Sequence, residues 1–190
     1  MKPATDASGR LFLNDPRGPL YLIKDNQMTT YLDLREKLSG LYSERGLGGG
    51  FNFFEFHPEF ETNGLFYTIH TEEPGVKTPD FKGPQGVDDT AIDSVVVEWK
   101  ANKPVASTFG GSFRQLMRVH FPRHIHCLQD MAFNPHSKQG DEDYGLLYVA
   151  IGEGGSMKAV QAVFLNRTDS IWGTITRIDP LGKNSPNGKY

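Results

Sequence analysis

Three histidines near the middle of the chain are the first candidates for chemistry. His120, His124 and His126 occupy alternate positions, and an unbroken strand would present all three on one face, as a metal site requires. Pro122 interrupts that strand because proline donates no hydrogen bond to the ladder. The pattern therefore predicts no metal site. His126 suits a general base near neutral pH, and the alternative is a loop histidine without a chemical role.

A candidate carboxylate lies in a glycine-rich turn. Glu153 is flanked by Gly152, Gly154 and Gly155, and glycines are common where the backbone φ must be positive. Glu153 is therefore either a plain turn residue or the partner of a catalytic group. The acidic run Asp-Glu-Asp at 141–143 lacks the alternating spacing of a calcium loop, so a solvated loop is predicted there.

Composition sets the class of protein. The 190 residues carry 20 Lys and Arg against 23 Asp and Glu, a net charge of −3, which argues against nucleic-acid binding. Hydrophobic residues make up 37% and aromatic residues 12% of the chain, which is enough for a packed core. No apolar run approaches the ~18 residues that span a bilayer, so no membrane span is predicted. Cys127 is the one cysteine, which excludes an internal disulfide.

Short strands must position these side chains. The apolar segments are rich in aromatic and β-branched residues and are separated by Gly, Pro, Asn and Asp, a pattern typical of antiparallel strands. Two breaker-free segments, 34–41 and 157–164, could form a turn or two of helix. The predicted strands are 10–14, 20–23, 30–34, 51–56, 65–70, 94–99, 115–121, 131–133, 146–151 and 174–178.

Two stretches of the chain repeat each other. Phe-His-Pro at 56–58 leads through a polar loop to Gly-Leu-Phe-Tyr at 64–67, and Phe-Asn-Pro at 133–135 leads to Gly-Leu-Leu-Tyr at 145–148. A repeat that holds several strands is typical of a propeller blade. We predict an all-β fold, an incomplete β-propeller of about two and a half four-stranded antiparallel blades. Its parts are 1–45, a remnant of a first blade; 46–122, a complete second blade; and 123–190, an incomplete third blade, all in one propeller domain truncated at both ends.

Six motifs in this order and spacing point to one family. They are Ser-Glu-Arg-Gly-Leu at 43–47, Phe-Glu-Phe-His-Pro-Glu-Phe at 54–60, Asn-Gly-Leu-Phe-Tyr at 63–67, His-Cys-Leu-Gln-Asp-Met-Ala-Phe at 126–133, Leu-Tyr-Val-Ala-Ile-Gly-Glu-Gly-Gly at 147–155 and Gly-Thr-Ile-Thr-Arg-Ile-Asp-Pro at 173–180. Over most of its length the chain resembles the soluble quinoprotein glucose/sorbosone dehydrogenases, PQQ-dependent aldose sugar dehydrogenases with six-bladed propellers.

The resemblance implies an oxidoreductase. The family's catalytic histidine falls on His126, which would remove the proton from the anomeric hydroxyl of an aldose while the hydride leaves for PQQ. The family's orienting aspartate falls on Glu153, and Gln129 stands where the family usually has glycine. Gln129 and Gly154 are expected to border the cofactor. The calcium that seats PQQ, and the cations around it, are expected in blades outside this chain.

The resemblance also implies the reaction partners of the protein and its cellular compartment. A sugar substrate and an external electron acceptor are expected. The resemblance implies a protein of the periplasm or the cell exterior. Residues 1–10 lack the apolar region of a signal peptide, so the leader is expected to be missing from this chain. A second hypothesis is a propeller of the same fold that binds a carbohydrate or a protein without catalysis, since fold alone does not decide function. Lys and Arg side chains in the pocket would favour the dehydrogenase, and a pocket of Phe and Gly would favour the second hypothesis.

Overall fold

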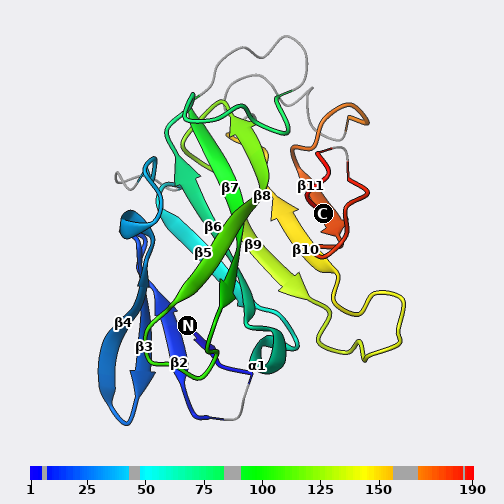
Figure 1. Ribbon diagram of the computed structural model, residues 1–190. Helices are drawn as coiled ribbons and strands as arrows, with labels where there is room; N and C mark the ends of the chain where they lie inside the picture. The colour runs from blue at the N-terminus through cyan, green and yellow to red at the C-terminus, as the bar shows by residue number, and fades with distance from the viewer. Residues whose placement is uncertain (6–7, 43–47, 84–90, 156–166, 186) are drawn as a thin grey trace.

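Three antiparallel sheets follow one another along the chain (Figure 1). The computed structural model describes residues 1–5, 8–42, 48–83, 91–155, 167–185 and 187–190. The first sheet has four strands, which are β1 (Lys2–Pro3), β2 (Leu11–Asn14), β3 (Pro19–Lys24) and β4 (Gln27–Asp33). The second sheet has four strands, which are β5 (Phe51–Phe56), β6 (Leu65–Glu72), β7 (Ile92–Ala101) and β8 (Gly111–Phe121). The third sheet has three strands, which are β9 (Leu128–Phe133), β10 (Leu147–Ile151) and β11 (Thr174–Ile178).

Each sheet is built from strands that are consecutive in the chain. Every neighbouring pair is antiparallel. The predicted all-β architecture and all ten predicted strands are confirmed within a few residues at each end. The predicted boundary between residues 45 and 46 and the predicted helix at 157–164 lie outside the described residues.

The helices differ from the prediction. Only the 3-10 turn η1 (Leu34–Glu36) forms in the predicted segment 34–41, with the Asp33 side chain capping it. The helix α1 (Phe60–Asn63), which was not predicted, is a single turn that ends at Gly64 with φ 71°. One turn is too short to show a helical repeat of apolar residues, and glycine stops it by adopting the left-handed conformation. Among the described helices, none has the length and apolar character needed to cross a bilayer.

Aromatic side chains join the first two sheets. Phe12 from β2 meets Phe56 from β5 edge to face, with ring centroids 4.9 Å apart, and it meets Tyr31 in the same way at 5.1 Å. Such pairs add about 0.5–1.5 kcal/mol each beyond the area they bury. Phe51 and Phe54 are also fully buried in this cluster, so they pack between the two sheets.

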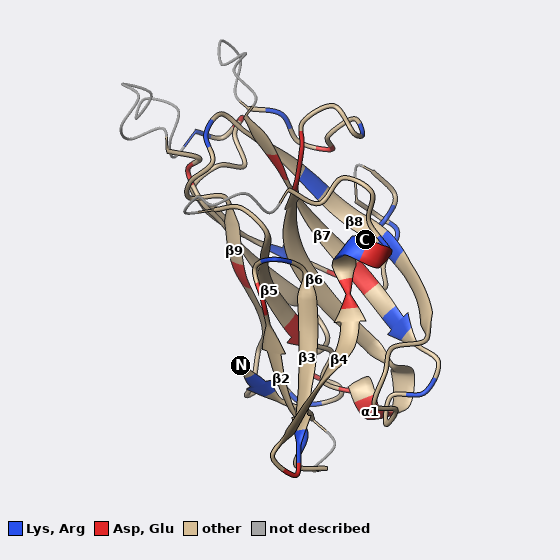
Figure 2. Cartoon of the chain, turned by 90° about the vertical axis from the view of Figure 1, so that its left-hand side faces the viewer, with Lys and Arg blue, Asp and Glu red and all other residues tan. Residues whose placement is uncertain are grey.

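A second apolar cluster joins the second and third sheets. It includes Tyr67 and Ile69 of β6, Met117 of β8 and Leu147 and Val149 of β10. The first strands of the two sheets, β5 and β9, also lie in contact. Charged residues of both signs are mixed along the same elements (Figure 2), as the small net charge leads one to expect.

The loop 122–127 connects the last strand of the second sheet, β8, to the first strand of the third sheet, β9.

Candidate functional site

His126 lies in that loop in an unusual backbone conformation. Its φ is 52°, the left-handed region that few residues other than glycine adopt. Two hydrogen bonds from the turn after β10 hold it there: Gly154 N–H donates to His126 O at 2.9 Å, and Gly152 N–H donates to Cys127 O at 3.0 Å. The histidine loop and the glycine-rich turn are therefore one unit.

Gly152 permits the close approach of these two segments. A Cβ at this position would lie 1.9 Å from His126 O and 2.7 Å from Cys127 O. Real carbon and oxygen atoms do not approach so closely, so any side chain would push the two segments apart. The glycine predicted to shape a turn thus also sets the place of the histidine.

Glu153 contacts the imidazole of His126. Its Oε1 meets His126 Nδ1, and its Oε2 accepts a hydrogen bond from Gly155 N–H at 2.5 Å. The Glu153 side chain is 17% exposed and that of His126 is 52% exposed. The carboxylate folds back onto its own turn, which accommodates the extra methylene of glutamate relative to aspartate. One oxygen is fixed by the backbone and the other orients the ring.

A pocket of about 450 Å³ opens beside this pair. Three of the four predicted site residues, His126, Glu153 and Gln129, line it. Gly154 does not, because its Cβ direction faces Phe121 and Pro122 at 2.8 Å. The catalytic and cofactor roles of the four residues stay predictions. The remaining lining residues are Cys127, Asp130, Ala150, Ile151, Gly152, Gly173, Thr174 and Ile175.

The charge of the pocket decides what it can hold. Asp130 and Glu153 contribute carboxylates, and no Lys or Arg occurs among its described lining residues. PQQ carries three carboxylates, which need cations nearby. The described residues of this pocket thus suit a base and its acid partner, but they do not fit the carboxylate groups of PQQ.

Cys127 lines the pocket, but its thiol is almost fully buried. Its side chain is 1% exposed, and burial raises the pKa of the thiol to about 12, with a smaller contribution from the Glu153 charge. A thiol held in its protonated form is a poor nucleophile, because the thiolate is the reactive species.

The other two histidines of the alternating set have separate surroundings. His124 packs edge to face on Tyr42, with ring centroids 5.0 Å apart, and the Nδ1 of His120 contacts Asp93. Across the described part of the chain, no group of three His, Cys, Asp or Glu side chains could hold a metal ion.

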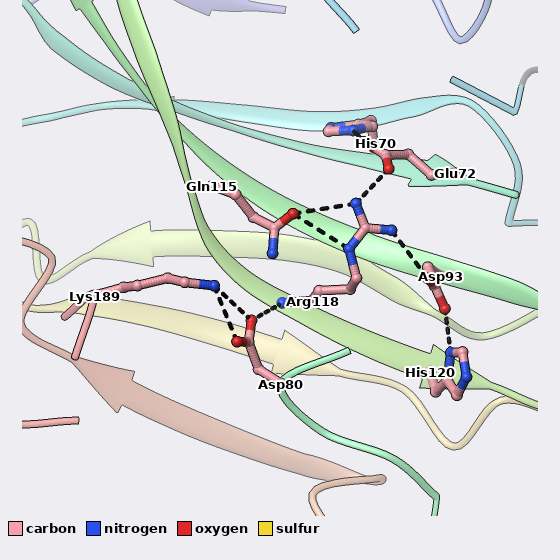
Figure 3. A network of polar contacts seen from close by, with 8 residues as sticks. All are labelled: His70, Glu72, Asp80, Asp93, Gln115, Arg118, His120 and Lys189. Atoms are coloured by element: carbon pink, nitrogen blue, oxygen red, sulfur yellow. Dashed lines mark hydrogen bonds and ion pairs between the residues drawn. The ribbon is translucent and has the colours of Figure 1, made fainter. Parts of the chain in front are cut away.

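A buried polar network in the second sheet was not predicted from the sequence (Figure 3). Arg118 is fully buried and binds both Asp93, at 2.9 Å between Nη1 and Oδ2, and Glu72. Its Nε also donates to Gln115 at 3.2 Å. Asp93 bonds in turn to His120, so one guanidinium links residues of β6, β7 and β8.

The network shifts the ionisation of its members. Burial opposes the charge of Glu72, but hydrogen bonds from His70 and Arg118 outweigh it and lower the pKa of Glu72 to about 2. Burial lowers the pKa of His70, despite its hydrogen bond to Glu72 at 2.9 Å. Register explains the cluster, because Glu72, Asp93 and His120 are direct cross-strand partners.

Comparison with known proteins identifies the fold. The chain matches no protein-family model and no curated protein. Among solved structures it matches an oxidoreductase from Thermus thermophilus described as a glucose dehydrogenase, at TM-score 0.62 and 19% identity over 95% of this chain and 43% of that one. It also matches the PQQ-bound aldose sugar dehydrogenase of Streptomyces coelicolor, at TM-score 0.59 and 18% identity over 96% of this chain and 46% of that one. The chain folds like part of a sugar dehydrogenase.

The same likeness extends to the apo form of the soluble aldose sugar dehydrogenase of Escherichia coli, at TM-score 0.54 and 14% identity. That match covers 88% of this chain and 40% of the other. The chain spans less than half the length of these three dehydrogenases. The incomplete propeller predicted from the internal repeat and the resemblance to this family are both confirmed at the level of the fold.

Proposed function

We propose that this chain forms the part of a sugar dehydrogenase that carries the general base, His126. The contact between His126 Nδ1 and Glu153 Oε1, beside a pocket of about 450 Å³, carries the proposal. The sugar-dehydrogenase fold supports it independently.

The geometry suits removal of a proton from a sugar hydroxyl. When His126 is neutral and its Nδ1–H donates to Glu153, the Nε2 lone pair is the one available to a substrate. Nε2 has no hydrogen-bond partner among the described residues. Proton transfer to Nε2 makes an imidazolium, which the adjacent Glu153 carboxylate stabilises as the acid of a triad does. A positioned base of this kind contributes about 10²–10⁴-fold in rate.

The substrate in this proposal is an aldose or a related sugar, oxidised at the anomeric carbon. PQQ with calcium would supply the hydride acceptor, and an external acceptor would take up the electrons. Since the described pocket residues do not fit the PQQ carboxylates, the cations that hold them belong to other parts of the protein. Of the predicted cofactor contacts, Gln129 lines the pocket and can offer an amide. We place the protein in the periplasm or outside the cell, as the resemblance implies.

One observation favours the second candidate function, a propeller that binds a carbohydrate or a protein without catalysis. The pocket beside His126 has no Lys or Arg in its described lining and has two carboxylates instead. A binding site for a neutral sugar needs no cations.

Dye reduction tests the dehydrogenase proposal. Full-length protein should reduce a dye when aldose, PQQ and calcium are all present, and His126→Ala should lower the rate by about 10²–10⁴-fold. His136→Ala, which removes an exposed histidine outside the pocket, is the matched control and should keep full activity. If PQQ with calcium changes neither the absorbance nor the melting temperature of the full-length protein, the dehydrogenase proposal fails and non-catalytic binding stands.

A further inference from the structure

A separate, basic pocket is lined in part by His120. It has a volume of about 270 Å³, and its lining residues are Gly75, Lys77, Thr78, Pro79, Lys82 and His120. It shares no residue with the pocket beside His126. None of its lining residues is acidic, although the chain as a whole has a net charge of −3.

The two lysines of this pocket form no ion pair within the described part of the chain. Lys77 and Lys82 are exposed, and neither forms an ion pair or a side-chain hydrogen bond with any described residue. An ammonium group offers three donors and no acceptor, and it binds phosphate oxygens as a point charge. Two such groups beside one pocket attract an anion.

His120 is a fixed third donor rather than a mobile surface side chain. Its ring is held at Nδ1 by Asp93, a carboxylate that is fully buried and also bonded to Arg118 (Figure 3). Asp93 itself does not line the pocket. The His120 side chain is 20% exposed, and its Nε2 has no partner among the described residues. In the imidazolium form this nitrogen carries a proton that can be donated to an oxyanion.

We propose that this pocket binds a small oxyanion, a phosphate or sulfate group that is either free or carried on a sugar. Lys77, Lys82 and His120 would bind its oxygens, with His120 held in place by the buried network. The volume lies just below the ~300 Å³ at which pockets for drug-sized ligands begin, which suits one such group rather than a nucleotide. The proposal does not depend on the dehydrogenase reaction.

Titration of the full-length protein with anions tests this site. Sodium phosphate and sodium sulfate should shift the His120 ring signals in NMR spectra, and sodium chloride at equal ionic strength should not. The double substitution Lys77→Ala/Lys82→Ala should weaken phosphate binding by about tenfold or more, because two charge-assisted contacts are lost. The substitution Lys37→Ala/Lys103→Ala makes the same change in net charge on exposed lysines elsewhere, and it should leave the affinity within about twofold.

A third titration, with glucose 6-phosphate, shows whether the site recognises a free oxyanion or one carried on a sugar. Glucose 6-phosphate that binds more tightly than inorganic phosphate would show that the group is recognised on a sugar, and equal affinities would show that the oxyanion alone is recognised. The proposal is overturned if neither phosphate nor sulfate moves the His120 signals beyond the chloride control. It is also overturned if Lys77→Ala/Lys82→Ala binds phosphate as tightly as the unmodified protein does.

Discussion

Replacing Arg118 with methionine removes the one cation at the centre of the buried network. Arg118 is fully buried and bonds to Asp93 and Glu72, which are 0% and 5% exposed. Breaking a buried ion pair by removing one partner costs about 3–5 kcal/mol, because the remaining charge is buried without compensation. We therefore expect Arg118→Met to lower the free energy of unfolding by about that amount near neutral pH.

The pH dependence of this loss follows from Glu72. The pKa of Glu72 falls from its usual 4.5 to about 2 in the folded protein. A carboxyl whose folded pKa is lowered contributes stability above its unfolded pKa and loses it as the pH falls through the folded pKa. The difference in stability between the unmodified protein and Arg118→Met should accordingly shrink as the pH is lowered from about 5 toward about 2.

Urea unfolding followed by tryptophan fluorescence measures the effect, since Trp99 and Trp172 are both buried. The melting temperature should fall by about 6–20 °C at neutral pH. Arg177→Met on the exposed face of β11 is the control and should stay within about 0.5 kcal/mol. A loss below about 1 kcal/mol for Arg118→Met, or a loss that is the same at all pH values, would refute the assigned role of the network.

Other predictions concern the site. Gly152→Ala should both lower the melting temperature and abolish dye reduction, because the new Cβ would lie 1.9 Å from His126 O. Thermal unfolding and the dye assay measure the two effects. A variant that is active and as stable as the unmodified protein would contradict this prediction. Cys127 should react with iodoacetamide far more slowly in the folded than in the urea-unfolded protein at about pH 8, since burial raises its pKa to about 12. Mass spectrometry of the alkylated protein gives both rates, and equal rates would show that the thiol is accessible.

The sheets could be predicted because each strand carries its own signal. Phe51–Phe56 and Thr174–Ile178 were predicted with the bounds that the structure has, since glycine or a turn precedes each and aromatic or β-branched residues fill them. The strand β1 (Lys2–Pro3) was missed, because two residues show no alternation. Its place depends on pairing with Leu11 and Phe12, which is information from another part of the chain.

The candidate site around His126 could be predicted only in part from the sequence. Motif resemblance brought His126 and Glu153 together as partners, and the structure places their side chains in contact. The buried network could not be found in this way, because Glu72, Asp93 and His120 become neighbours only once the register of β6, β7 and β8 is known. His70 and Glu72 lie two positions apart, so the sequence could indicate that they share one face of a strand. It could not indicate that Arg118 would bind Glu72.

The tautomer of His126 tests the central claim most directly. NMR correlation of ring nitrogens and carbons in ¹⁵N-histidine-labelled protein, at a pH where the ring is neutral, reports which nitrogen carries the proton. If Glu153 orients the base, the proton is on Nδ1 in the unmodified protein, and Glu153→Ala moves the equilibrium toward the other tautomer. A proton on Nε2 in the unmodified protein, or a tautomer that Glu153→Ala leaves unchanged, would contradict the assignment of His126 as a base held by Glu153.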